Sequence, residues 1–222
     1  MVHVNVASQP MFFVVSRAVD GALMRPAQSP VAMPAERAYV PHMSSPALMT
    51  ADELLHVRIP DQRVELVRGT LVVREPPGYT HGRVTVNLAV RLAAHLENRG
   101  APQVIVAKTG FTLARNPDSV RGPDLAVLRR DRVPVPEPHG FLELGPDLVV
   151  EVLSPGDRPG EVLAKVADWL SAGTKLVWVI DPERRLTRVY RADGSGLTVT
   201  ADQALDGEDA VPGFSCPLAA IF

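Results

Sequence analysis

Apolar residues occur in two rhythms along this chain, one typical of helices and one typical of strands. Over residues 80–100 every fourth position is apolar, which predicts a helix with one buried face, begun by Thr80 as its N-cap and ended by Gly100. A second helix is predicted over residues 160–172, where apolar positions again share one face and Gly173 follows. The apolar positions of the first helix are Val84, Leu88, Leu92 and Leu96.

Short runs of β-branched and aliphatic residues predict the strands. The first two runs are separated only by Arg68 and Gly69, which favours a hairpin. The runs over residues 124–128 and 148–153 are the most apolar, so we expect them in the centre of a sheet. In chain order the runs are 63–67, 70–74, 103–107, 111–113, 124–128, 148–153, 175–180 and 186–191. Strands and helices are mixed, so the predicted fold class is α/β or α+β.

Residues 1–49 show neither rhythm and contain scattered proline, serine and alanine. We therefore expect a flexible N-terminal extension over this segment. The ordered domain is expected over residues 50–222. It begins with a short helix, because Thr50 and Glu53 have the spacing of a capping box.

Composition narrows the possible classes of protein. With 222 residues, of which 46% are hydrophobic and 22% charged, the chain is large enough for one domain with a sizeable core. A net charge of -2 gives no general attraction to nucleic acid, so any such binding needs a local basic surface. Cys216 is the single cysteine, which rules out an intrachain disulfide and favours the reducing cytoplasm. The apolar patch at residues 11–15 is too short to cross a bilayer, so we expect no membrane association.

Two acidic residues occur where a sheet core is predicted. Glu151 lies inside the apolar run LVVEVL, and Asp124 opens the run that follows Gly122 and Pro123. Burying an unpaired carboxylate is costly, so such a group shifts its pKa, pairs with a cation or binds a metal. If the two strands are neighbours in register, their carboxylates converge, and oxygen ligands suit Mg²⁺ or Mn²⁺. A structural pair held by loop amides or by an arginine explains the two residues equally well at this point.

Lys165 is the cation best placed to accompany these carboxylates. It lies at the edge of the apolar arc of the second helix and could stabilise negative charge beside a metal. The competing explanation is an ion pair with Glu161, which lies four residues earlier. His81 follows the predicted cap and is either solvated or contacts a phosphate or Glu65. Glu65 by itself is typical of an exposed hairpin residue that pairs with a neighbouring arginine.

Several ordered motifs together resemble the Uma family of restriction endonuclease-like proteins, which belongs to the PD-(D/E)xK nuclease superfamily. The resemblance extends from residue 50 to about residue 191. The motifs are VELVRGTLVV, PPGYTHGRV, GPDLAVL, VVEVLSP and KVADWLSAGTKLVWVIDP. The resemblance implies a mixed β-sheet flanked by helices and the hydrolysis of DNA with Mg²⁺ or Mn²⁺ as cofactor. It also implies a homodimer, since two sites are often used to cut both strands.

The resemblance assigns a role to particular residues. Asp124 and Glu151 match the metal ligands, and Glu65 matches the acidic residue that precedes them. The superfamily lysine is expected two residues after the glutamate, but Leu153 occupies that position. Lys165 matches a lysine that is supplied from the following helix instead. The remaining correspondence is His81, as an accessory residue near the first long helix.

Other assignments are weaker. Arg121, Arg129 and Arg130 bracket the run that begins at Asp124 and could contact the phosphate backbone of DNA, although such charges are also common in solvated loops. Residues 156–160 lack the Gly-Lys-Ser/Thr ending of a phosphate loop, so we expect no nucleotide cofactor. Neither GxSxG nor HExxH occurs, which leaves no support for a serine hydrolase or a zinc enzyme. The alternative to an endonuclease is a nuclease-like module that binds nucleic acid or protein without catalysis.

Overall fold

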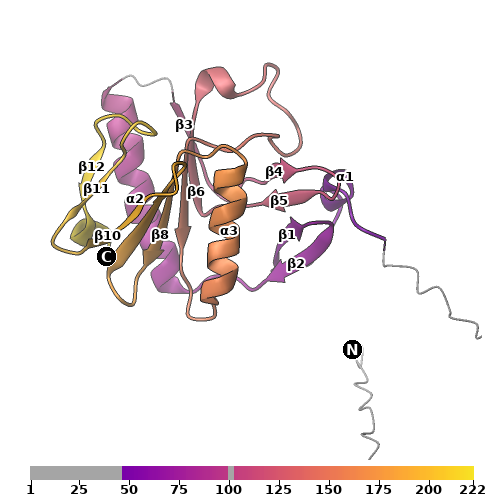
Figure 1. Ribbon diagram of the computed structural model, residues 1–222, viewed down its shortest axis with the longest axis horizontal. Coiled ribbons are helices and arrows are strands. Elements are labelled where there is room, and N and C mark those ends of the chain that lie inside the picture. Colours follow the sequence, from indigo (N-terminus) through magenta and orange to yellow (C-terminus); the bar gives the residue numbers. More distant parts are fainter. Residues whose placement is uncertain (1–46, 100–102) are drawn as a thin grey trace, which may run out of the picture. The chain divides into compact units, whose positions relative to one another are not determined.

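The computed structural model describes residues 47–99 and 103–222, and these residues form an α+β domain built on a six-stranded sheet (Figure 1). The spatial order of the strands is β10 (Gly196–Thr200), β9 (Leu186–Arg191), β8 (Leu176–Asp181), β7 (Leu148–Val152), β6 (Leu125–Arg129) and β3 (Gln103–Val106). Only β7 and β8 are parallel, and the other neighbours within this sheet are antiparallel. Helix α3 (Pro159–Ser171) connects the parallel pair, as a parallel pair requires a crossover connection.

The two long helices lie against opposite faces of this sheet (Figure 1). Helix α2 (Tyr79–Asn98) covers one face with its four predicted apolar residues. Helix α3 covers the other face with Val166 and Trp169. Side chains alternate along β7, so Val150 faces the α2 side whereas Val149 faces the α3 side. Glu151 has the same parity as Val149 and therefore points towards α3.

A second sheet packs beside α3. Its strands, in spatial order, are β2 (Thr70–Arg74), β1 (Arg63–Val67), β5 (Ser119–Arg121) and β4 (Phe111–Ala114). Helix α1 (Ala51–Leu54) closes a small core over this sheet with Leu66 and Val120. The remaining elements are two 3-10 helices, η1 (Arg130–Arg132) and η2 (Leu218–Ile221), and the paired strands β11 (Ala204–Asp206) and β12 (Ser215–Pro217).

Most of the predicted elements are confirmed. The hairpin pairs Arg63 with Arg74 and Val67 with Thr70, and the capping box of α1 is formed by Thr50 and Glu53. The predicted N-cap of α2 is wrong, because the helix begins one residue before Thr80 and its N-cap is Gly78, which lacks a capping side chain. Strands β5, β10, β11 and β12 were not predicted. Strand β5 contains three residues, and its burial comes from pairing with β1 and β4 rather than from a local pattern.

The expected extension lies mostly outside the described residues. Residues 1–46 are not described, and neither are residues 100–102. Met49 is already attached to the domain, since its amide donates to the carbonyl of Gly69 at 2.9 Å. No helix within residues 47–99 and 103–222 has the length and hydropathy needed to cross a bilayer.

The packing of α2 predicts a strong asymmetry between its two faces. Leu88 is fully buried, so Leu88→Ala should lower the free energy of unfolding by about 2–5 kcal/mol. Val86 lies on the same helix with 59% of its surface exposed, and Val86→Ala should change that free energy by less than about 0.5 kcal/mol. Urea unfolding followed by circular dichroism measures both. Equal effects of the two substitutions would contradict the burial of this face.

Candidate active site

Asp124 and Glu151 meet at one end of the main sheet. Strands β6 and β7 are antiparallel neighbours with Leu125 opposite Val150, and extending this register by one residue puts Asp124 opposite Glu151. The amide of Asp124 also donates to the carbonyl of Val150 at 3.1 Å. Both acidic residues are buried, with 3% and 8% of their surface exposed. Two carboxylates directly opposite each other repel, so this end of the sheet needs positive charge nearby.

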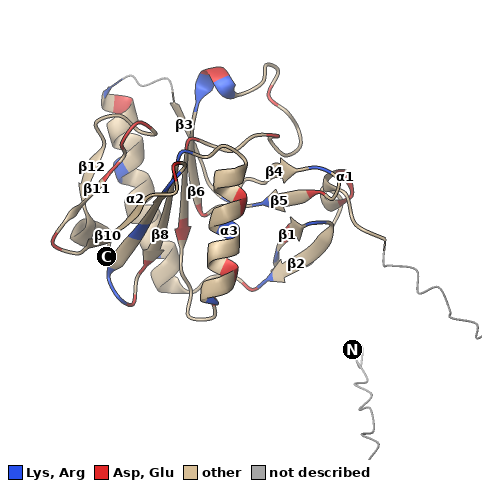
Figure 2. Cartoon of the chain, in the orientation of Figure 1, with Lys and Arg blue, Asp and Glu red and all other residues tan. Residues whose placement is uncertain are grey.

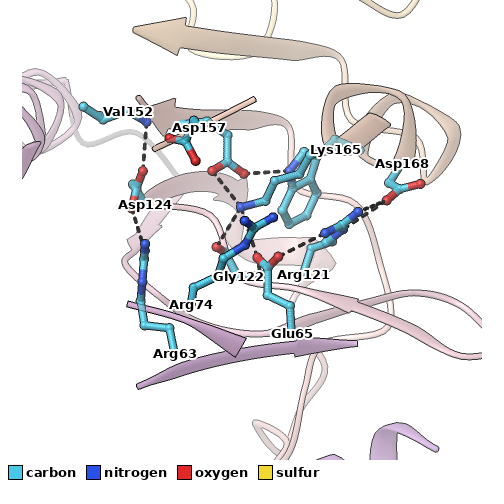
Figure 3. A network of polar contacts seen from close by, with 12 residues as sticks. Arg63, Glu65, Arg74, Arg121, Gly122, Asp124, Val152, Asp157, Lys165 and Asp168 are labelled. Carbon is cyan, nitrogen blue, oxygen red and sulfur yellow. Dashed lines mark hydrogen bonds and ion pairs between the residues drawn. The ribbon is translucent and has the colours of Figure 1, made fainter. Parts of the chain in front are cut away.

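Helix α3 supplies two donors to Glu151, and one of them, Lys165, is labelled in Figure 3. The ammonium of Lys165 lies 2.8 Å from Oε2, and the indole N–H of Trp169 donates to Oε1 at 2.9 Å. The two residues are one helical turn apart and therefore share a face. Glu161, the competing partner for Lys165, forms an ion pair with Arg74 instead. Trp169 is one of the apolar positions of the predicted helix over residues 160–172 and was expected only in the core, because nothing in the sequence marks a role for its indole N–H.

Lys165 also joins Glu151 to Glu65 of the second sheet. The ammonium lies 3.0 Å from Oε1 of Glu65, and the amide of Gly122 donates to the same oxygen at 3.1 Å. The other oxygen of Glu65 accepts from Arg121 at 3.0 Å. The four residues predicted as catalytic, Glu65, Asp124, Glu151 and Lys165, therefore belong to one buried polar cluster.

Arg121 is an interior counter-ion. Its guanidinium donates to Glu65 and, at 2.6 Å, to Asp168 of α3, and only 5% of the residue is exposed. The N–H groups of Arg121 are thus directed at Glu65 and at the partly buried Asp168, and no observation here supports the predicted contact of Arg121 with DNA. Arg129 and Arg130 lie at the opposite end of β6 from Asp124, which is about 16 Å along an extended strand. Arg129 is exposed and paired with Asp131.

Asp124 is held by three donors. Its Oδ2 accepts from the amide of Val152 at 2.8 Å and lies 2.9 Å from Nε2 of His81. Its Oδ1 lies 3.3 Å from the guanidinium of Arg63. His81 is buried in the first turn of α2, so it is not a solvated residue, and it binds Asp124 rather than Glu65. The predicted contact with a phosphate stays a prediction. Arg63 was predicted only as a surface partner of Glu65.

Burial and charge separate the acidities of the three carboxyl groups. Burial raises the pKa of Glu151 to about 7, and the neighbouring Asp124 and Glu65 add to the shift although Lys165 opposes it. Burial would also raise the pKa of Asp124, but the hydrogen bond and charge of His81 and the amide of Val152 outweigh it and lower that pKa. The pKa of Glu65 is likewise lowered, since Lys165 and Arg121 outweigh its burial. One carboxyl group of the cluster therefore ionises near neutral pH.

The donor set fits a divalent cation of the magnesium type. Asp124, Glu151 and His81 line a hollow of about 60 Å³ together with Lys165 and Asp157. Within the described part of the chain, no group of three His, Cys, Asp or Glu side chains is arranged to hold a metal. Mg²⁺ does not need such a cage, because it commonly binds through one or two carboxylates and keeps waters or phosphate oxygens as its other ligands. Burial raises the pKa of Glu151 most, repulsion from Asp124 and Glu65 adds to the shift, and a bound cation would favour the ionised form against both.

Leu153 lies two residues after Glu151, where the sequence resemblance led us to expect a lysine. It follows β7 directly, its amide donates to the carbonyl of Ile180 at 2.8 Å, and its partly buried side chain packs against the core on the α3 side. The cation beside Glu151 thus comes from α3, as the sequence predicted. Residue 153 therefore contributes no polar group to the site.

Comparisons with known proteins agree with this architecture. The chain resembles the crystal structure of a putative nuclease belonging to DUF820 from Anabaena variabilis with a TM-score of 0.69 and 20% identity, covering 78% of this chain and 97% of that chain. At this identity the likeness concerns the fold. No curated protein matches the chain. A family model, Uma2, described as "Putative restriction endonuclease", matches residues 51–219. The chain therefore belongs to the Uma2 family of restriction endonuclease-like proteins.

Proposed function

We propose that this protein is a metal-dependent endonuclease that hydrolyses phosphodiester bonds of DNA. Membership of the Uma2 family supports a nuclease-like function. The observation that carries the more specific proposal is the meeting of Glu65 and Glu151 at the ammonium of Lys165, with Asp124 opposite Glu151 on the neighbouring strand. These residues come from separate elements, and a purely structural ion pair would not need three carboxylates at one place.

Asp124 and Glu151 would hold the metal, Mg²⁺ or Mn²⁺. When bound, such an ion polarises the phosphate and lowers the pKa of water, which supplies the nucleophile. The residues around the two carboxylates fix their orientation. Trp169 holds one oxygen of Glu151, while His81 and the amide of Val152 hold Oδ2 of Asp124. This support resembles the outer-shell hydrogen bonds that orient ligands in metal sites.

Lys165 acts as a positive charge rather than as a base. Burial alone would lower its pKa, but Glu151 and Glu65 outweigh burial and raise the pKa above the usual value. The ammonium therefore keeps its proton at neutral pH. It can stabilise the negative charge that develops on the phosphate and can donate a hydrogen bond to the attacking water. Glu65 and Arg121 keep the ammonium in place from the side of the second sheet.

DNA as the substrate, a homodimer as the assembly and the cytoplasm as the location remain parts of this proposal. Cys216 is free and buried, which agrees with a reducing compartment. The homodimer rests on the family resemblance. No nucleotide cofactor is required for the proposed reaction.

Replacement of Glu151 tests the metal site. Glu151→Gln removes one ligand charge, so we expect Mg²⁺-dependent cleavage of plasmid DNA to fall by more than the roughly 10- to 100-fold that loss of an outer-shell partner causes. Glu183→Gln makes the same chemical change at an exposed turn and should cleave like the wild type. Thermal unfolding of both variants verifies that they fold.

Undiminished cleavage by the folded Glu151→Gln variant would refute the assignment. DNA binding without metal-dependent cleavage, and unaltered by Glu151→Gln, would instead support the non-catalytic alternative.

Removal of the ammonium separates catalysis from metal binding. Lys165→Met should lower kcat by about 100- to 1000-fold, the usual effect of removing a donor that stabilises transition-state charge. Mn²⁺ binding, measured by isothermal titration calorimetry, should not weaken, because the ammonium repels a divalent cation. A loss of Mn²⁺ affinity with kcat retained would contradict this role of Lys165.

The raised pKa of Glu151 predicts how metal binding depends on pH. A carboxylate must lose its proton to bind metal, so Mn²⁺ affinity should rise roughly tenfold per pH unit below about 7 and level off above it. In the metal-free protein, the same group binds its proton more tightly when folded than when unfolded, where its pKa is about 4.5. Its contribution to stability is thus fully present below about 4.5 and is lost as the pH rises to about 7. Both dependences should be absent in Glu151→Gln.

A further inference from the structure

A second hollow adjoins the carboxylate site and is lined mainly by cations. It has a volume of about 190 Å³, and its charged lining comprises Arg63, Glu65, Arg74, Lys108 and Lys165. Arg63 and Lys165 also line the hollow that contains Asp124 and Glu151, so the two hollows share a wall. The first contains three carboxylates, Asp124, Glu151 and Asp157, whereas the second contains four cationic side chains and one carboxylate. We name the second one the basic hollow.

Two of the cations occupy directly opposed positions in the β1–β2 hairpin. Arg63 pairs with Arg74 in the register of the two strands. Figure 2 shows a positively charged (blue) segment at the end of the hairpin beside α3. Like charges at such positions destabilise a hairpin. Local folding therefore gives no reason for this pair, and an anion bound between the strands and α3 would offset the repulsion.

The arginines retain donors for an anion. One terminal nitrogen of Arg63 reaches Asp124 at 3.3 Å, and its buried Nε has no hydrogen-bond partner within the described residues. Arg74 pairs with Glu161, but 38% and 44% of these side chains are exposed, and such surface pairs are weak. A guanidinium carries five N–H donors in a geometry that matches phosphate oxygens.

Lys108 reaches the basic hollow from the turn between β3 and β4. Its backbone has a φ of +52°, which is uncommon for a residue other than glycine. The turn is held in place because the amide of Lys108 donates to the carbonyl of Pro123, next to Asp124, at 3.1 Å. The side chain is exposed and forms no ion pair among the residues described. Its ammonium is therefore available to a ligand.

The one carboxylate of the basic hollow is already neutralised. Glu65 is paired with both Lys165 and Arg121. The lining of the basic hollow therefore has more cationic than acidic side chains, whereas the whole chain has a net charge of -2. A phosphate group is the ligand that matches arginine and lysine donors converging beside a magnesium-type site.

From these contacts we infer that Arg63, Arg74 and Lys108 form a subsite for a backbone phosphate of the nucleic acid, next to the phosphate that is cleaved. This inference rests on the proposed nuclease function. Phosphate contacts of this kind position a strand without reading its sequence. The subsite would therefore fix the register of the strand over Asp124 and Glu151 for any base sequence.

Binding measured without metal tests the subsite independently of catalysis. Fluorescence anisotropy with a labelled DNA duplex in EDTA gives the dissociation constant at several salt concentrations. Arg74→Gln and Lys108→Gln should each weaken binding and reduce the slope of log K against log salt by about one, the value for a lost phosphate contact. Arg68→Gln is the matched control, since Arg68 is exposed at the other end of the same hairpin, about 16 Å away along the strands.

The partner of Arg74 gives a test of opposite sign. Glu161→Gln removes the carboxylate that competes with phosphate for Arg74, so DNA should bind more tightly than to the wild type. If Arg74 serves only its ion pair with Glu161, Arg74→Gln and Glu161→Gln will both bind DNA like the wild type. Thermal unfolding of all four variants excludes loss of folding as the cause.

Several outcomes would overturn the inference. These are an unchanged salt slope in Arg74→Gln and Lys108→Gln, or an equal reduction in Arg68→Gln. A third is that inorganic phosphate saturates a site in the wild type, while DNA binding is insensitive to both Arg74→Gln and Lys108→Gln. That result would indicate a site for free phosphate. If the binding variants behave as expected but Glu151→Gln still cleaves, the subsite stands and the proposed metal site fails. If instead Glu151→Gln loses cleavage but Arg74→Gln and Lys108→Gln bind DNA like the wild type, the proposed metal site stands and the subsite fails.

Discussion

The ammonium of Lys165 is the contact on which this site depends. It lies within 3.0 Å of Glu65 and within 2.8 Å of Glu151, and so connects the small sheet, the main sheet and α3. Two buried carboxylates brought together without a cation would repel each other and lose their solvation. Breaking a buried ion pair by removing one partner generally costs about 3–5 kcal/mol. Under the proposed function, the same charge would also face the substrate phosphate.

Two pairs of like charges lie beside this cation, and each is unfavourable when considered alone. Asp124 is opposite Glu151 on the main sheet, and Arg63 is opposite Arg74 on the hairpin. Like charges at opposed strand positions destabilise a sheet, so each pair needs compensation from its surroundings. Lys165 and His81 contact the acidic pair, while Asp124 and Glu161 contact the two arginines. Under the proposed function, a divalent cation and a substrate phosphate would add to this compensation.

The cation beside Glu151 comes from a helix and not from the same strand. Leu153 lies two residues after Glu151, at the strand position where the sequence resemblance led us to expect a lysine, and it packs with the apolar core. Helix α3 crosses the same face of the sheet, so a lysine on its inner edge reaches the same carboxylate. Trp169, one turn later, fixes the other oxygen of Glu151. A single helix therefore provides both the charge and the orientation of this carboxylate.

Local patterns in the sequence determined the helices, the hairpin and the central strands. They also marked Asp124 and Glu151 as carboxylates in unusually apolar surroundings. These features were predictable because burial of one face leaves a period in the order of residues, and because a charge inside an apolar strand is conspicuous. The tertiary structure alone decided which groups surround the carboxylates. His81 binds Asp124 across 43 positions of sequence, and Arg121 binds Glu65 across 56 positions. No local pattern encodes such contacts, since they follow from how α2, α3 and the two sheets pack together.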